Sequence, residues 1–186
     1  MSRDLRRKPV MSDLKYPFCV LDVDGTLTFA YDHFHPDTLT PVQEYRRRGG
    51  VVALLSGRLP EGMLRAVQWL GLPAGTLLGG GDGAVGARLR EDGSFKCIWE
   101  DALDVEKLLP GLIRAASPGV ALTTRRVIAV GDTNEVMNRM AAITAPEISR
   151  IAGWDRLPEA LGDEKLCGLR FILEREKTLR LIDILS

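Results

Sequence analysis

The stretch Phe18-Cys19-Val20-Leu21-Asp22-Val23-Asp24-Gly25-Thr26 passes from four apolar residues directly into two acidic residues and a glycine. A short apolar run bounded by turn residues is typical of a buried strand in a parallel sheet. The sequence therefore predicts a buried strand over residues 18–21 that carries the Asp22 carboxylate at its carboxyl end.

Helical and apolar segments alternate after this strand. Helices are expected at 36–48 and 60–70, strands at 51–55 and 76–78, and a glycine-rich turn at 79–83. Strands and helices in alternation with short links are typical of the α/β class, here a Rossmann-like parallel sheet core flanked by helices. Ligands bind such sheets beyond the carboxyl ends of the strands. Asp22 and Ser56 both follow a strand directly, so they are expected at the same edge.

Two carboxylates one residue apart at such an edge suit phosphoryl transfer. Asp22 can attack phosphorus and form an aspartyl-phosphate, while Asp24 can protonate the leaving oxygen and later activate water. Gly25 lets the backbone approach a phosphate and offer N–H groups. A Mg²⁺ ion would bridge carboxylate and phosphate oxygens and offset their repulsion. The alternative is an ordinary acidic loop, since Asp-Gly is a common turn dipeptide.

Ser56-Gly57-Arg58 forms a second polar element, at the end of the apolar run 51–55. A hydroxyl and backbone N–H groups at a strand end, just before a helix, can hold a phosphoryl oxygen. A capped helix start is the alternative interpretation. The position about 30 residues after the aspartates, across one helix and one strand, favours the phosphate-binding one.

These motifs resemble those of the haloacid dehalogenase superfamily. Asp22-Val23-Asp24-Gly25-Thr26-Leu27 matches its first motif and Ser56-Gly57-Arg58 its second. The protein looks most like the sugar-phosphatase-type branch with a large α/β cap after the third core strand (Cof-like, type IIB). Proteins of that branch usually have an Asn-Gly-Ala turn after the third core strand. This sequence has Gly81-Asp82-Gly83-Ala84-Val85 at the corresponding place, which is a partial match. The resemblance covers residues 18–86 well and 87–186 in outline.

The resemblance implies roles for individual residues. Asp22 is expected to be the nucleophile and Asp24 the acid/base, with Mg²⁺ bound by the Asp22 side chain and the Asp24 backbone carbonyl. The residues expected to bind phosphate are Gly25, Thr26, Ser56 and Gly57.

The second half of the sequence is expected to form an α+β cap module. The expected elements are a hairpin at 84–99 turning at 92–93, a helix at 104–116 broken or bent near Pro110, a hairpin of strands 120–122 and 127–130, helices at 134–142 and 157–161, a strand at 169–173 and a helix at 177–185. The predicted division is a flexible leader at 1–15, a core at 16–83 and a cap-like region at 84–186.

The superfamily also needs a lysine that neutralises the phosphate and a late acidic motif that completes the metal shell. The apolar run 127–130 ends in Gly131-Asp132, so Asp132 is one candidate for that motif. Only residues 123–126 separate this run from the preceding one, whereas a parallel strand needs a crossover of a dozen or more residues. This spacing favours a hairpin inside an incomplete cap, with the lysine and the late motif expected beyond Ser186 in a C-terminally truncated homologue. Both assignments of Asp132 stay open.

The composition restricts the possible partners. Twenty-five basic residues balance twenty-five acidic ones, so no overall field attracts nucleic acid or an anionic membrane. No apolar run reaches the roughly 18–20 residues of a membrane helix. Cys19, Cys97 and Cys167 are odd in number and far apart, which favours reduced thiols in a cytoplasmic protein.

The predicted function is Mg²⁺-dependent hydrolysis of a small, sugar-phosphate-like monoester, so the expected partner is a small phosphorylated metabolite. Phosphomutase or phosphonatase chemistry from the same nucleophile is one alternative. A non-catalytic homologue that keeps a phosphate-binding core as a binding or regulatory module is another. The sequence leaves the oligomeric state open.

Overall fold

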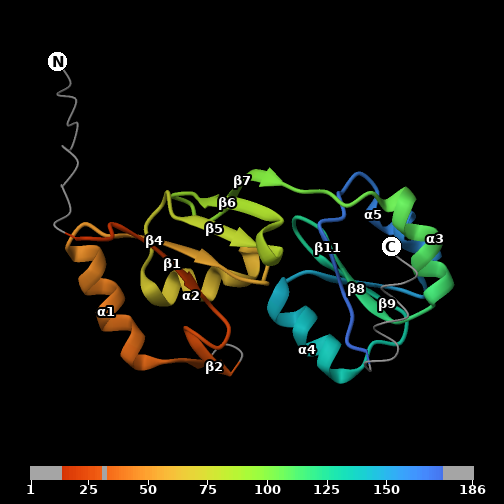
Figure 1. Ribbon diagram of the computed structural model, residues 1–186, viewed down its shortest axis with the longest axis horizontal. Helices are drawn as coiled ribbons and strands as arrows, with labels where there is room; N and C mark the ends of the chain where they lie inside the picture. The colour runs from red at the N-terminus through yellow and green to blue at the C-terminus, as the bar shows by residue number, and fades with distance from the viewer. Residues whose placement is uncertain (1–13, 31–32, 174–186) are drawn as a thin grey trace, which may run out of the picture.

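The computed structural model describes residues 14–30 and 33–173. The first sheet contains β1 (Phe18–Asp22), β4 (Val51–Leu55), β5 (Leu77–Gly80), β6 (Val85–Leu89) and β7 (Phe95–Glu100), in that spatial order. The second has the order β10 (Ile148–Ile151), β9 (Val127–Val130), β8 (Gly119–Leu122), β11 (Gly168–Arg170). A small pair joins β2 (Thr28–Ala30) and β3 (His33–Phe34). Figure 1 shows the two large sheets side by side.

The helices are α1 (Pro36–Arg47), α2 (Leu64–Leu70), α3 (Val105–Ala115), α4 (Glu135–Thr144) and α5 (Leu157–Leu161), with single 3-10 turns at η1 (Pro60–Met63), η2 (Gly81–Gly83) and η3 (Trp154–Arg156). The predicted α/β class is confirmed, and most predicted elements are present within a few residues of their expected bounds. The predicted helix 177–185 and all of the leader except residues 14 and 15 lie outside the described residues.

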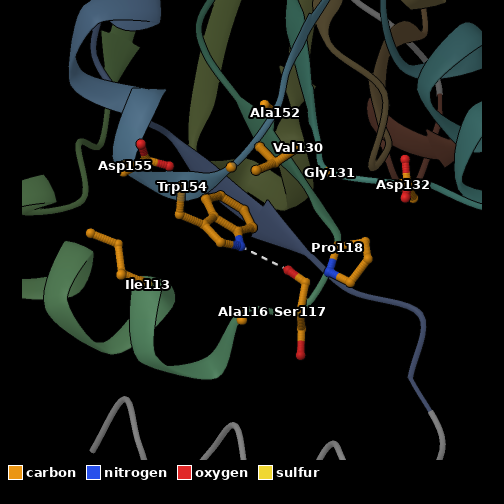
Figure 2. A pocket seen from close by; sticks show the side chains of 11 residues that line it. Ile113, Ala116, Ser117, Pro118, Val130, Gly131, Asp132, Ala152, Trp154 and Asp155 are labelled. Atoms are coloured by element: carbon orange, nitrogen blue, oxygen red, sulfur yellow. Dashed lines mark hydrogen bonds between the residues drawn. The ribbon is translucent and has the colours of Figure 1, made fainter.

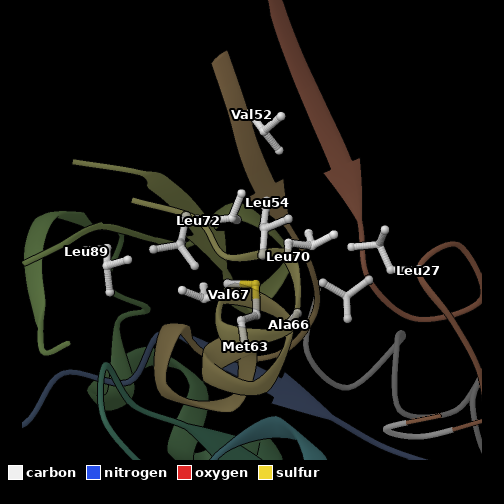
Figure 3. Close-up of a cluster of buried hydrophobic side chains, with 11 residues drawn as sticks. Leu27, Val52, Leu54, Met63, Ala66, Val67, Leu70, Leu72 and Leu89 are labelled. Atoms are coloured by element: carbon white, nitrogen blue, oxygen red, sulfur yellow. The ribbon is translucent and has the colours of Figure 1, made fainter. Parts of the chain in front are cut away.

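The core of the first sheet lies on one face, under α1 and α2. The strands β1, β4 and β5 are parallel, as predicted. Val52 and Leu54 of β4 pack against Met63, Val67 and Leu70, and these side chains are at most 5% exposed (Figure 3). Because α2 has apolar residues spaced three and four apart, it presents one continuous stripe to the sheet.

No part of the chain that the structure describes covers the opposite face of β1 and β4. Phe18, Val20, Val51 and Leu55 are each about half exposed, although all four are large and apolar. The prediction that these two strands are buried is therefore wrong for one face. A near-continuous apolar run is typical of a strand covered on both sides, but among the described residues only one side of this pair is covered.

The hairpin β6–β7 belongs to the first sheet. Leu78 of β5 lies opposite Ala87 of β6 in an antiparallel pair, and β7 extends the sheet further. The sequence assigns residues 84–99 to the cap-like region, whereas strand pairing carries the first sheet past the glycine turn to Glu100. A strand's residue pattern shows which face is apolar but not which sheet it joins, so the pattern could not supply this assignment.

The second sheet is covered on both faces. Met137 and Ala141 of α4 pack on the face that carries Val120 and Leu122. The other face, with Ala121, Ile128 and Val130, packs against Leu112 of α3 and Leu157 of α5. The strands β8 and β9 form the predicted antiparallel hairpin, and β10, which the sequence did not predict, lies parallel to β9.

The sequence predicts a break or a bend near Pro110; the helix α3 continues through this residue, so a break is absent. A proline removes the hydrogen bond to the carbonyl four residues earlier, and its ring crowds that carbonyl. Here that carbonyl belongs to Glu106, in the first turn, where the helix has little ordered structure to lose. No helix among residues 14–30 and 33–173 is long and apolar enough to cross a membrane.

One hydrophobic cluster joins the two sheets. Leu59 and Val85, from the first sheet's side, pack with Val120, Val127 and residues of α4, and all of these side chains are buried. The Leu59 N–H also donates to the carbonyl of Thr144, the last residue of α4, at 2.8 Å. The first module, which is the first sheet with α1 and α2, and the second module, which is the second sheet with α3, α4 and α5, therefore share part of their core.

Candidate active site at the edge of the first sheet

A tight loop after β1 holds Asp22 and Asp24. Val23 and Leu27 are buried anchors, at 0% and 2% exposure. The Val23 carbonyl accepts hydrogen bonds from the N–H groups of Leu27 and Thr28, each at 2.9 Å. Gly25 has φ +82°, a backbone conformation that a side chain would strain. Because Val23 points inward, the two aspartates on either side of it are exposed.

The groups of this loop that are predicted to bind phosphate form hydrogen bonds within the loop itself. The Gly25 N–H donates to the Thr28 carbonyl at 2.9 Å, and the Thr26 N–H lies 3.4 Å from the Val23 carbonyl. The Thr26 hydroxyl donates to Oδ2 of Asp22 at 3.0 Å. In this arrangement Thr26 orients the Asp22 carboxylate, and phosphate binding by Gly25 and Thr26 stays a prediction.

Ser56-Gly57-Arg58 follows β4 and lies beside the aspartates, as the strand order predicts. Asp22 is opposite Leu55 in the parallel pair. The buried Ser56 hydroxyl donates to Oδ2 of Asp24 at 3.3 Å and accepts the Arg58 N–H at 3.1 Å. The two motifs are therefore joined directly, although 32 residues separate Asp24 from Ser56.

Arg58 forms a bidentate ion pair with Asp24. Its Nη2 donates to Oδ1 of Asp24 at 2.6 Å, and its Nε to Oδ2 at 3.0 Å. The Arg58 side chain is only 4% exposed, against 40% for Asp24. Its Nη1 also donates to the Gly62 carbonyl at 3.2 Å. Such a bidentate, charge-assisted pair is stronger than a neutral hydrogen bond and fixes the geometry of both groups.

The second module supplies the opposite wall. Asp22, Asp24, Gly57, Arg58 and Asp82 line a hollow of about 320 Å³ together with Met140, Ile143, Thr144 and Arg170. Met140, Ile143 and Thr144 lie on α4, and Arg170 ends β11. The hollow therefore combines a polar floor from the first sheet with a partly apolar wall from the second module.

The donor set suits a weakly held Mg²⁺ ion. Mg²⁺ is commonly bound through one or two carboxylates, with water and phosphate oxygens completing six ligands. The exposed Asp22 carboxylate and the Asp24 backbone carbonyl fit that pattern, while both Asp24 carboxylate oxygens face Arg58. Within residues 14–30 and 33–173, no three His, Cys, Asp or Glu side chains cluster closely enough to hold a metal by themselves.

Asp132 lies in a different hollow. Together with Pro118, Val130, Trp154 and Asp155, it lines a space of about 340 Å³ at the carboxyl ends of β9 and β10 (Figure 2). The Trp154 Nε1–H donates to the Ser117 carbonyl there at 2.7 Å. Since β9 belongs to the second sheet, the hairpin interpretation of 127–130 is confirmed, and Asp132 is not at the edge that carries Asp22.

The sequence assigns no role to several residues of the site, and Arg58 and Arg170 are the two charged ones that contact the motifs. The sequence shows Arg58 only as part of a motif, because its contact with Asp24 depends on the placement of two neighbouring strand ends. Arg170 stands 113 residues from Gly57, yet its Nη2 donates to the Gly57 carbonyl. An isolated arginine in a short strand carries no signal of such a contact, so only the tertiary structure reveals it.

Comparison with known proteins supports the fold. No protein-family model matches the sequence, and no curated protein matches it. A haloacid dehalogenase-like hydrolase from B. subtilis superposes with a TM-score of 0.66 at 16% identity, covering 88% of this chain and 64% of that one. A superfamily phosphatase from Bacteroides thetaiotaomicron gives 0.64 at 20% identity, covering 92% and 61%. A subclass IIB sugar phosphatase gives 0.66 at 15% identity, covering 90% and 63%.

The protein thus has the fold of haloacid dehalogenase-like hydrolases, and the predicted resemblance, including that to subclass IIB, is confirmed at this level. At these sequence identities the likeness concerns the fold. The chain spans between 61% and 64% of the length of these three solved structures.

Proposed function

We propose that this protein is a Mg²⁺-dependent phosphatase that hydrolyses a small, sugar-phosphate-like monoester through an aspartyl-phosphate on Asp22. The observation that carries the proposal is that Asp22, Asp24, Gly57 and Arg58, from two parallel strand ends, line one hollow. Carboxylates and a strand-end backbone turn at one edge of such a sheet are the groups that phosphoryl transfer requires.

Asp22 is proposed as the nucleophile. Its carboxylate is exposed at the tip of β1, and the Thr26 hydroxyl holds Oδ2. With one oxygen held, the other is oriented for in-line attack on phosphorus, which splits the displacement into two steps. A bound Mg²⁺ would supply the positive charge that lets an anionic carboxylate approach a phosphate dianion.

Asp24 is proposed as the acid that protonates the leaving oxygen and the base that then activates water. Both of its oxygens accept hydrogen bonds from Arg58, so Asp24 must turn away from Arg58 to reach the leaving group. The Asp24 side chain is 40% exposed, which leaves room for that rotation. The buried Arg58 then acts as a fixed partner to which the carboxylate returns.

A small phosphorylated metabolite is proposed as the substrate. Its volume of about 320 Å³ is at the small end of the range for ligand pockets. Met140 and Ile143 offer an apolar wall against which a carbon skeleton can pack. The sugar phosphatase among the structural neighbours supports a sugar phosphate as the first substrate to test.

The experiment is hydrolysis of para-nitrophenyl phosphate by the purified protein, with and without Mg²⁺. Turnover should require Mg²⁺, and Asp22→Asn should reduce it to background. Asp132→Asn, which removes a carboxylate from the other hollow, should leave the rate within about twofold. A folded wild-type protein that shows no turnover over the Asp22→Asn variant would refute the proposed activity.

Phosphate binding without turnover is the second candidate. The ion pair that occupies both oxygens of Asp24 favours it, because an acid/base locked in that pair could not serve the leaving group. Inorganic phosphate would then bind to the protein, while para-nitrophenyl phosphate would stay intact. The same assay, combined with a phosphate titration, separates the two candidates.

A further inference from the structure

Arg170 reaches from the second module into the edge of the first sheet. Its Nη1 donates to the Thr144 hydroxyl at 3.1 Å, and its Nη2 donates to the Gly57 carbonyl and to Oδ2 of Asp82, the latter at 2.9 Å. The side chain is 18% exposed, so the guanidinium is held in place at the hollow instead of extending into solvent.

Gly57 makes this approach possible. A Cβ atom at position 57 would lie 2.6 Å from Nη2 of Arg170 and 2.9 Å from Oδ1 of Asp82. Both distances are shorter than ordinary van der Waals contacts, so any side chain there would displace the pair. The glycine of the second motif thus leaves space for a cation from the other module.

The two arginines of the hollow differ in how firmly they are paired. Arg58 is almost fully buried and holds both oxygens of Asp24. Arg170 holds one oxygen of Asp82, whose side chain is 74% exposed. An exposed carboxylate loses little when an ion pair opens, because water replaces the guanidinium. Arg170 can therefore exchange its partner more easily than Arg58 can.

A phosphate dianion is a better partner for Arg170 than Asp82 is. Guanidinium groups bind phosphate oxygens through two parallel hydrogen bonds, and a dianion carries more charge than a carboxylate. The hollow also carries three carboxylates, those of Asp22, Asp24 and Asp82, which would repel a phosphate. A cation at Gly57 offsets that repulsion, and no lysine is among the described residues that line the hollow.

We propose that Arg170 is a phosphate-binding residue of this site, which releases Asp82 and takes hold of the phosphoryl group of the substrate. The proposal rests on the proposed function in that it concerns the same hollow. It assigns to the second module a direct contact with the reacting group. The competing interpretation is that the Arg170–Asp82 pair only tethers the two modules.

The test measures the dissociation constant of inorganic phosphate by isothermal titration, with Mg²⁺ present, for the full-length protein and its variants. Arg170→Gln should weaken phosphate binding at least tenfold, and Arg170→Lys less. Asp82→Asn should tighten binding two- to fivefold, because it removes the competitor for Arg170. Arg150→Gln is the matched control: it also removes one positive charge from the second module. It alters the hydrogen bonds to Thr133 and Asn138 and should leave phosphate binding unchanged.

The double variant Arg170→Gln/Asp82→Asn distinguishes the two interpretations. If Asp82 acts by competing for Arg170, the tightening caused by Asp82→Asn disappears once Arg170 is absent. If it persists, Asp82 repels phosphate independently, and the exchange is refuted. A tether alone predicts that Arg170→Gln lowers the melting temperature without changing phosphate affinity, which would also overturn the proposal.

The phosphate-binding test of Arg170 and the turnover assay of the proposed function can fail independently of each other. Should Asp22-dependent turnover exist while Arg170→Gln leaves phosphate affinity and KM intact, Arg170 is not a phosphate ligand and the phosphatase stands. Should turnover be absent while Arg170→Gln still weakens phosphate binding tenfold, the phosphatase falls and the phosphate contact stands. A wild-type protein that does not bind phosphate at millimolar concentration refutes the Arg170 proposal whatever the assay of turnover shows.

Discussion

The Arg58 guanidinium grips Asp24 side-on, with Nη2–Oδ1 at 2.6 Å and Nε–Oδ2 at 3.0 Å. The two partners are unequally buried, since the arginine side chain is 4% exposed and the aspartate 40%. Removing the charge of Asp24 therefore leaves the Arg58 cation without its counterion in the protein interior. Asp22, by contrast, is exposed, and its only described side-chain partner is the Thr26 hydroxyl. The two aspartates should differ in stability effect as well as in chemistry.

We expect Asp24→Asn to lower the free energy of unfolding by about 1–3 kcal/mol, less than for a fully buried pair because Asp24 is partly solvated. Asp22→Asn is the matched control and should change it by less than about 0.5 kcal/mol. Urea denaturation of both variants at pH 7 measures the difference. Equal stability of the two variants would mean that the Arg58–Asp24 pair contributes nothing net.

Gly62→Ala should push η1 away from α4. A Cβ at position 62 would lie 2.8 Å from the Ile143 carbonyl oxygen and closer still to that of Thr144, and backbone atoms cannot yield as a flexible side chain can. We expect Gly62→Ala to lower the free energy of unfolding by about 1–3 kcal/mol, the range for an overpacked core. Gly153→Ala is the control, because its new Cβ would meet only the end of the Asp155 side chain. It should lower the free energy of unfolding clearly less. Thermal unfolding of both variants checks the order, and the reverse order would contradict it.

Burial raises the pKa of the Cys167 thiol from 9.0 to about 11. The folded state thus favours the protonated thiol, so this group's contribution to stability is complete below pH 9 and is lost as the pH rises from 9 towards 11. Cys167→Ala should remove that part of the alkaline loss. The measurement is the difference in urea midpoint between wild type and variant at pH 7, 9 and 10.5. A constant difference across these values would contradict the shift.

The same raised pKa and burial should protect Cys167 from alkylation. The thiolate is the reactive form, and with a pKa of about 11 only about one molecule in a thousand carries it at pH 8. Cys97 is exposed and should react first in the native protein, as mass spectrometry after timed iodoacetamide treatment would show. Alkylation of Cys167 before Cys97 under native conditions would be inconsistent with the structure.

The apolar face of β1 and β4, which residues 14–30 and 33–173 leave exposed, should make the protein associate. Phe18, Val20, Val51 and Leu55 are neighbouring apolar side chains at about half exposure, and contiguous apolar surface promotes contact between molecules. Val20→Thr combined with Val51→Thr keeps β-branched residues in both strands and removes two apolar groups. Sedimentation velocity over a concentration series should show less association for this variant than for wild type. Identical sedimentation of wild type and variant would show that this face does not mediate association.

The sequence predicts the first half of the fold well because each of its elements carries a local signal. The apolar run 51–55 is bounded by Gly50 and Ser56 and needs no tertiary information to be recognised. The sequence does not predict the strand β10, because Ile148-Ser149-Arg150-Ile151 is short and half polar. The sequence does predict the hairpin β6–β7, but the sheet that the hairpin joins depends on pairing with β5.

For the site, the sequence supplies the residues of the two strand ends but not the wall opposite them. Asp22, Asp24 and Gly57 stand in recognisable motifs, and the structure brings them to one hollow. Thr144 ends α4 and Arg170 ends β11, and both elements belong to the second module. Their approach depends on how two modules pack, which no local pattern encodes.

The cluster that Leu59 and Val85 share with Val120, Val127 and α4 has a consequence for how the molecule melts. Because apolar residues of both sheets are buried against each other, separating the modules would expose surface in each of them at once. The two sheets should therefore unfold in a single cooperative transition, with equal calorimetric and van't Hoff enthalpies. Proteolysis of the native protein would then not release either module as a folded fragment.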